Sequence, residues 1–214
     1  MKTFFVIIFL IISLSVKSQQ GYAITFKRAE LTTNIISKNK FKFVYNDSFA
    51  FQYYYQGNDP LKKQHLYSKK LIHHSIFINR TSFLTYNEVD ANIKLLIVDT
   101  IKPSTWMPTT TTKNILGYTC KGALQVSPTN DSTLIWYTDA LGTGVGFLCL
   151  HFNLGQPLEV YDQRTNRYFL ATTIEKGNYQ FNLPKAPIYS VAAYQQLTQQ
   201  LLNKPSTLSI RFYD

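Results

Sequence analysis

The stretch "NILGYTCKGALQV" at residues 114–126, followed after five residues by "STLIWYTD" at residues 132–139, predicts two paired β-strands. Gly117 suits a turn or bulge through which the chain enters the first strand. Side chains alternate along a strand, so Tyr118 and Cys120 are expected on the same face. The connection Ser-Pro-Thr-Asn-Asp consists of turn-forming residues. The strand with Trp136 is therefore expected to be the hairpin partner of the first.

The composition favours the same kind of structure along the chain. Fifteen Tyr and fifteen Phe accompany only 16% charged residues, and aromatic and β-branched residues suit half-buried pleated surfaces. Apolar side chains alternate in 22–26, in 41–45 and in 49–55. The last two runs flank Asn46-Asp47-Ser48, which predicts a second hairpin. Lys42 would then lie on the solvated outer face of its strand.

Further short strands are expected at residues 71–78, 82–86, 93–100, 167–176 and 208–212. Pro103, Pro108 and the four threonines 109–112 indicate a linker inside the domain. One helix is expected after Ser190, which can cap it, and apolar residues recur at spacings of three or four up to Leu201. The predicted fold is mainly β (α+β): a curved antiparallel sheet or half-barrel of about ten strands, with one C-terminal helix packed on it. We expect a single domain spanning 19–214.

The N-terminus has the layout of a secretory signal peptide. A basic start with Lys2 precedes a mostly apolar run over 4–16 and a small-residue exit, which predicts cleavage after Ser18. The apolar run is shorter than the roughly twenty residues that a membrane-spanning helix needs. The sequence therefore predicts export to the periplasm or secretion, without an integral membrane span after the signal is removed. A retained membrane anchor is the alternative.

The charge balance is basic but carries little information about partners. The net charge of +10 falls to +8 without Lys2 and Lys17. An exported chain rarely meets nucleic acid, and no arginine-rich or aromatic-interleaved pattern supports such binding. The lysines at 38, 40, 42, 62, 63, 69 and 70 are interpreted as a solvated loop and the outer face of a strand. No nucleic-acid partner is expected.

Catalytic and metal-binding patterns are weak. The four histidines are His65, His73, His74 and His151, and the adjacent pair would leave a strand on opposite faces. We expect no metal site and no cofactor. Cys149 and His151 would share one strand face, but no third group orients them. The carboxylate pairs Glu88–Asp90 and Glu159–Asp162 have no distinguishing context, and the "GTGVG" at residues 142–146 lacks the Lys-Ser or Lys-Thr of a phosphate loop. This segment is interpreted as a flexible loop, and the chain is not expected to be an enzyme.

The two cysteines are interpreted as a structural pair. Cys120 and Cys149 lie 29 residues apart in an exported chain, where thiols can oxidise. A disulfide between them would stabilise the fold by roughly 3–4 kcal/mol in the chain-entropy model. Two buried free thiols are the alternative.

The central segment combines a series of residues that is typical of one family: Gly117, Tyr118, Cys120, Ala123, Trp136, Tyr137, Thr138, Gly155, Leu158 and Glu159. With these residues it resembles the GLPGLI family of exported proteins from the phylum Bacteroidetes. The sequence departs from the family's own signature: "FNLGQPLE" stands in its place, and only Gly155, Leu158 and Glu159 of the signature remain. A neighbouring exported family with a similar layout fits "GQPLE" about as well. The resemblance implies a distant likeness to LolA-like lipoprotein carriers, whose half-barrel holds acyl chains. It implies no catalytic residues.

Two functions remain open from the sequence. One is a non-catalytic interaction or assembly role in the cell envelope, with an envelope protein as partner. The alternative is a periplasmic carrier of a hydrophobic ligand, such as a lipid or acyl chain, in a LolA-like half-barrel. Its predicted ligand-binding residues are Phe49, Phe51, Tyr53, Tyr55 and Trp136. The competing interpretation is that these rings only fill the core.

Overall fold

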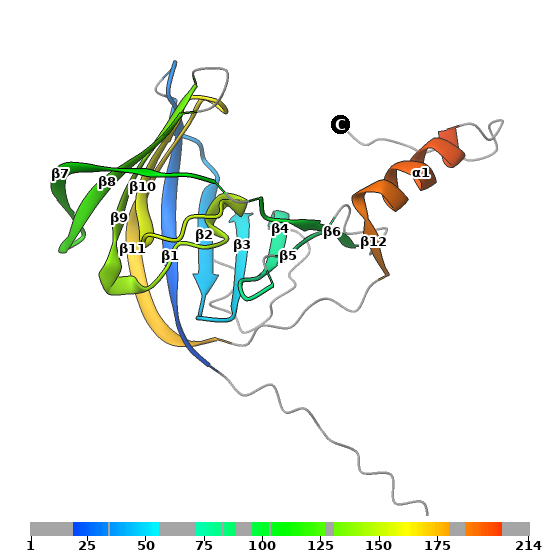
Figure 1. Cartoon of the computed structure of the whole chain (residues 1–214), viewed down its shortest axis with the longest axis horizontal. Helices are drawn as coiled ribbons and strands as arrows, with labels where there is room; N and C mark the ends of the chain where they lie inside the picture. Colours follow the sequence, from blue (N-terminus) through cyan, green and yellow to red (C-terminus); the bar gives the residue numbers. More distant parts are fainter. Residues whose placement is uncertain are drawn as a thin grey trace, which may run out of the picture.

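The computed structural model describes residues 19–33, 35–55, 72–82, 84–88, 96–102, 104–126, 131–179 and 187–202. Among these residues, twelve strands form a single sheet (Figure 1). The strands are β1 (Gln19–Glu30), β2 (Lys40–Tyr45), β3 (Phe49–Tyr55), β4 (Ile72–Asn79), β5 (Leu84–Glu88), β6 (Leu96–Thr100), β7 (Met107–Ile115), β8 (Tyr118–Val126), β9 (Ser132–Thr138), β10 (Gln156–Asp162), β11 (Arg167–Tyr179) and β12 (Ile188–Ser190). Two 3₁₀ turns, η2 (Asp139–Leu141) and η3 (Phe147–Cys149), lie between β9 and β10, and the helix α1 spans Val191–Leu202.

The sheet order is β12-β6-β5-β4-β3-β2-β1-β11-β10-β9-β8-β7. Every neighbouring pair is antiparallel except β12 with β6, which is parallel. Twist and register shifts in β1, β3, β7 and β10 curl this long sheet into a half-barrel (Figure 1). The predicted mainly β fold with one C-terminal helix is confirmed.

The helix begins where the sequence predicts it. The Ala193 backbone N–H donates to Ser190 Oγ at 3.2 Å, so Ser190 caps the first turn. The helix contacts β12 and β6 at one end of the sheet, where Figure 1 shows it projecting from the curved body. The Gly117 turn is confirmed as well, because the β7–β8 hairpin turns through Leu116 and Gly117, both with positive φ.

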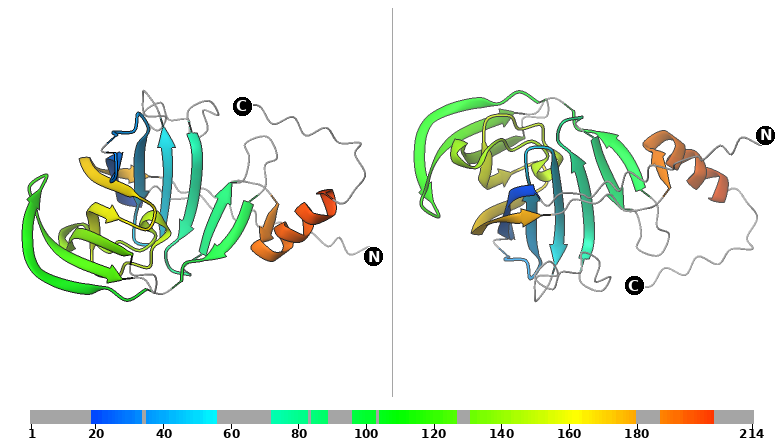
Figure 2. Two further views of the ribbon diagram at one scale, coloured as in Figure 1. Left: turned by 90° about the horizontal axis from the view of Figure 1, so that it is seen from above. Right: turned by 90° about the horizontal axis from the view of Figure 1, so that it is seen from below.

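The inner face of the sheet is filled by the chain itself. Segment 139–155, between β9 and β10, lies inside the curve of the strands (Figure 2). Phe147 is fully buried there, and its ring lies 4.9–5.6 Å from the rings of Phe26, Phe41 and Phe43. Further along, the Phe152 ring meets Trp106 and Tyr137 edge to face. The hydrophobic core is therefore closed by this segment.

Three polar side chains on the inner face hold segment 139–155 in place. The buried Arg80 donates from Nε to the Val145 carbonyl at 3.1 Å and from Nη2 to Thr143 Oγ1 at 2.6 Å. Tyr45 donates its hydroxyl to the Leu141 carbonyl at 2.8 Å. Gln52 accepts from the Leu148 N–H at 3.0 Å. Buried backbone groups need such partners, so these contacts select one conformation of the segment.

The interpretation of residues 142–146 as a flexible loop is wrong. Gly144, Val145 and Gly146 are buried, and a Cβ on Gly144 would collide with the Gly155 carbonyl oxygen and the Phe152 ring. The glycines are present because the backbone crosses another chain segment at close range. The loop is a packed part of the core.

The predicted linker over 109–112 is also wrong, because these threonines belong to β7. Threonine has high β propensity, and a proline such as Pro108 is tolerated in an edge strand. The prediction that Lys42 lies on a solvated face is wrong as well. Lys42 is only 2% exposed, and its Nζ lies 3.8 Å from Glu175 Oε2. The reason is that Ala23, Val44, Tyr53 and Tyr55 form a second buried cluster on the outer face.

Some predictions lie outside the described residues. They concern the signal peptide at residues 1–18, the lysines of 62–70, His65, Asp90 and the last strand at 208–212.

Candidate functional site

A polar groove lies at the mouth of the half-barrel, between the ends of several strands and the segment that fills the inner face. It begins as a cavity of about 280 Å³, which we call the β9–β10 cavity. The cavity's polar side chains come from the ends of β8, β9 and β10, and its apolar floor comes from η3 and β10. Its lining is Gln125, Val126, Asp131, Thr133, Leu148, Leu150, Val160, Asp162 and Arg164.

A second cavity of about 410 Å³, the β5–β6 cavity, adjoins the first. It is lined by Thr85, Asp99, Thr100, Ile101, Lys102, Ser104, Gln125, Cys149, Leu150 and His151. Gln125 and Leu150 line both cavities. The two cavities therefore form one groove, and these two residues mark its waist.

The groove offers hydrogen-bonding groups of both kinds with little net charge. Two aspartates and one arginine line the β9–β10 cavity, and Asp99 and Lys102 line the other. Part of this chemistry is already used, because Thr133 Oγ1 donates to Asp162 Oδ1 at 3.3 Å and Arg164 Nη2 lies 3.7 Å from Asp162 Oδ2. The arrangement suits a neutral ligand with many hydroxyl groups better than a strongly charged one.

Cys149 at the floor of the groove is not activated as a nucleophile. Burial raises the pKa of its thiol from 9.0 to about 11, although a hydrogen bond from Gln52 Nε2 at 3.3 Å acts in the opposite direction. The thiolate is the nucleophilic form, so the thiol stays protonated near neutral pH. His151 lines the same cavity, but the Cys149–His151 pair lacks the lowered pKa that cysteine catalysis needs.

The backbone at the floor is strained. Leu148 and Cys149 have φ values of +51° and +59°, in the left-handed region that side chains rarely adopt. The side chain of Gln52 contacts both residues. Its Oε1 accepts from the Leu148 N–H, and its Nε2 donates to the Cys149 sulfur. Such conformations persist only where the surroundings impose them, and they are frequent at ligand sites.

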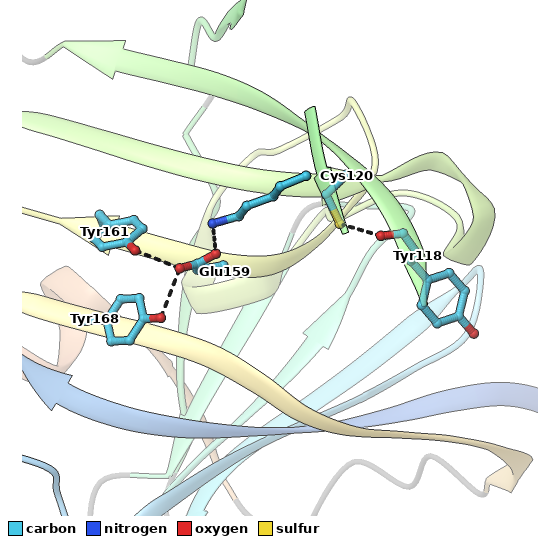
Figure 3. A network of polar contacts seen from close by, with 6 residues as sticks. Tyr118, Cys120, Glu159, Tyr161 and Tyr168 are labelled. Carbon is cyan, nitrogen blue, oxygen red and sulfur yellow. Dashed lines mark hydrogen bonds and ion pairs between the residues drawn. The ribbon is translucent and has the colours of Figure 1, made fainter. Parts of the chain in front are cut away.

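A separate polar network lies on the outer face of the sheet, since Glu159 pairs with Trp136 and alternates with the groove residue Val160. Figure 3 shows the side chains of this network. The buried Glu159 accepts through Oε1 from the Tyr161 hydroxyl at 2.7 Å and from the Tyr168 hydroxyl at 2.9 Å. Its other oxygen, Oε2, pairs with Lys113 Nζ. The Lys113 Nζ atom also lies 4.3 Å from the centre of the Trp136 ring. Every group in this network already has a partner, so we interpret it as structural.

The structure does not bring the predicted ligand-binding residues together. Phe49, Phe51, Tyr53 and Tyr55 lie on the outer face of β3, whereas Trp136 belongs to β9, five strands away in the sheet. That is about 24 Å at the usual strand spacing. Tyr53 and Tyr55 are 0% and 3% exposed, while the other three are partly exposed. None of the five lines the groove.

The predicted disulfide is wrong, since Cys120 and Cys149 are both free thiols. Cys120 lies on the outer face, where its strand neighbour Gly122 pairs with Trp136. Cys149 lies on the inner side, against Gln52. With the sheet between them, the two sulfur atoms cannot approach to bonding distance without backbone movement. Instead, Cys120 packs in the hydrophobic core and Cys149 lines the groove.

The other residue pairs from the sequence are separated. Glu159 lies on the outer face and Asp162 in the groove, so they do not form a catalytic carboxylate pair. Within the described ranges, no three His, Cys, Asp or Glu side chains come close enough together to hold a metal ion. The groove residues Gln125, Thr133 and Arg164 were not predicted, because the ends of strands carry no local motif that identifies them.

The fold and the groove define a class of protein: a half-barrel whose own chain fills the interior and whose polar groove lies at the mouth. The family model described as "N-glycanase peptide, N-terminal domain" matches residues 24–200, more than four fifths of the chain. The chain belongs to this family. No curated protein matches it.

The solved structures that share the fold include two of PNGF-II. The structures of PNGF-II in space groups C2 and P21 match with TM-scores of 0.62 and 0.61, at 19% and 17% sequence identity. They cover 85% and 86% of this chain. The chain spans about a third of the length of the PNGF-II chains, 33% and 34%.

The family match overturns the resemblance to the GLPGLI family and the LolA-like likeness that it implied. The residues that carried the resemblance have structural explanations. Gly117 forms the β7–β8 turn with positive φ, and a Cβ on Gly155 would approach the Tyr137 ring to 2.6 Å. Any sheet with a tight hairpin and a crossing loop needs residues of these kinds, so they do not identify one family.

Proposed function

We propose that this chain is a non-catalytic module of N-glycan processing, and that it binds the carbohydrate of N-linked glycoconjugates in the groove. The observation that carries the proposal is the groove itself: a polar, nearly charge-balanced surface with an apolar floor, in a chain of the N-glycanase N-terminal family. Sugars present hydroxyl groups at their edges and C–H groups on their faces, and such a lining can satisfy both.

The non-catalytic part of the proposal is supported by the state of Cys149 and Glu159. The pKa of Cys149 is raised to about 11 by burial. Glu159 is occupied by Lys113 and two tyrosine hydroxyls, away from the groove. Hydrolysis needs a nucleophile or a general base that is free to reach the substrate, and neither group meets that condition.

The proposal includes export, because N-linked glycoproteins are met outside the cytoplasm. It is supported by the signal-type N-terminus at residues 1–18. No helix in the part of the chain that the structure describes is long and apolar enough to cross a bilayer. A glycoprotein partner replaces the lipid or acyl ligand as the expected partner.

The test is a titration of the full chain with a neutral oligosaccharide released from an N-glycoprotein. We expect saturable binding by calorimetry and amide chemical-shift changes centred on Gln125, Thr133 and Thr100. Incubation with an N-glycopeptide should release no glycan by mass spectrometry. Absence of saturable binding, or shifts confined to other surfaces, would refute the binding role. Glycan release that copurifies with the folded chain would refute the non-catalytic role.

A further inference from the structure

The waist of the groove carries a free hydrogen-bonding group. The Gln125 side chain is partly buried and lines both cavities. Within the described part of the chain, its amide forms no hydrogen bond. A primary amide has two donors and one acceptor with two lone pairs. This group is therefore available to a ligand that passes from one cavity into the other.

The two sides of the waist have the same kind of lining. Thr133 and Asp162 lie on one side, and Asp99 and Thr100 on the other, with Leu150 as a shared apolar floor. Each side also has one cation, Arg164 or Lys102. Two polar compartments that share the neutral residues Gln125 and Leu150 match a ligand built of repeated polar units.

We propose that the groove binds a linear, neutral oligosaccharide of at least two sugar units, with one unit in each cavity and the linkage between them at Gln125. This inference rests on the proposed carbohydrate binding and adds the length and charge of the ligand. An acidic sugar is disfavoured, because three aspartates line the groove against two cations. A peptide is disfavoured as well, because no described aromatic side chain or deep apolar pocket lines the groove to hold its side chains.

The first experiment compares ligand lengths. Calorimetry of the full chain with N-acetylglucosamine and its β-1,4-linked disaccharide and trisaccharide should show at least a tenfold gain in affinity from one unit to two. Only a small further gain is expected from two units to three, because each cavity is then already occupied. A sialylated trisaccharide should bind more weakly than the neutral one.

The second experiment locates the contact. Gln125→Ala and the isosteric Gln125→Met should each lower the affinity for the disaccharide at least fivefold. The two variants differ in size, so a shared loss reports the amide and not the packing. Gln195→Ala on the exposed surface of α1 is the matched control and should change nothing.

Single-cavity variants complete the design. Thr133→Val and Thr100→Val remove one hydroxyl from each cavity and should both weaken the disaccharide, whereas only one of them should weaken the monosaccharide. Thr119→Val, exposed on the same strand as Gln125 but outside the groove, is the control.

The outcomes separate this inference from the proposed function. Equal affinities for one and two units, or unchanged disaccharide binding in both Gln125 variants, would refute the two-unit ligand while carbohydrate binding survives. If no saccharide binds but an extended peptide shifts the groove amides, both proposals fail.

Discussion

Replacing Lys113 by Met tests whether the outer-face network stabilises the sheet. The substitution removes the cation from the buried Glu159 carboxylate, whose side chain is 5% exposed, and leaves only two tyrosine donors. Breaking a buried ion pair by removing one partner costs about 3–5 kcal/mol. Lys113 is 32% exposed, so solvent screening reduces the expected loss of unfolding free energy to about 2–3 kcal/mol.

A double-mutant cycle gives the magnitude of the pair itself. Glu159→Gln keeps one oxygen for the tyrosine hydroxyls and leaves Lys113 free to reach solvent, so it should cost less, about 1–2 kcal/mol. The double variant should be less destabilised than the sum of the single variants by about 1–2 kcal/mol. Urea unfolding followed by tryptophan fluorescence and far-UV circular dichroism measures all four proteins, and equal m-values would show that the comparison is valid.

The control is the exposed ion pair between Lys121 on β8 and Asp139 just after β9, whose Nζ and Oδ2 atoms lie 2.7 Å apart. Both side chains are more than half exposed. Lys121→Met should leave the unfolding midpoint unchanged, because exposed pairs contribute little. Additive losses from Lys113→Met and Glu159→Gln, within about 0.5 kcal/mol, would refute the reasoning. So would a Lys121→Met variant as unstable as Lys113→Met.

Four further outcomes are expected. Arg80→Leu removes the donors that hold segment 139–155 and should lower the unfolding free energy by about 3–4 kcal/mol. A loss below about 1 kcal/mol in urea unfolding would show that packing alone holds this segment in place. The raised pKa of Cys149 favours its neutral form in the fold, so the stability it contributes is complete below pH 9 and is lost as the pH rises towards 11, by up to about 3 kcal/mol. The pH slope of the unfolding free energy should flatten in Cys149→Ser. Thiol titration of the denatured, unreduced protein should count two free thiols. A count of zero would show that Cys120 and Cys149 form a disulfide after all. Mass spectrometry of the protein purified from cells that express the whole sequence should find Gln19 as the first residue, and an intact Met1 would exclude cleavage.

Much of the fold follows from local pattern. Alternation in residues 41–45 and 49–55, the turn at Gly117 and the cap at Ser190 each correspond to an element at that place. Local pattern failed where neighbours decide the outcome. The threonines of 109–112 become part of a strand because β8 pairs with Pro108 and Thr112, on either side of a register shift. Lys42 is buried because a second apolar cluster forms on the outer face.

The site was less accessible to sequence reasoning. Gln125 lies at the groove's waist only because β8 ends beside η3, and nothing in "KGALQV" distinguishes it from any other strand glutamine. Arg80 directly follows β4 and looks like an ordinary turn residue. Its guanidinium nevertheless donates hydrogen bonds to Thr143 and Val145, which lie 63 and 65 positions later in the chain. Cys120 and Cys149 suggested a pair by their number and compartment, but the two faces of the sheet separate them.

By itself, the sequence determined the class of fold and the position of most strands and of the helix, because side-chain alternation, turn residues and caps act over a few neighbouring residues. Only the tertiary structure decided which face of each strand is buried, that segment 139–155 fills the half-barrel, and that a polar groove forms at its mouth. These features depend on contacts between residues far apart in the chain, and such contacts have no signature in any short stretch of sequence.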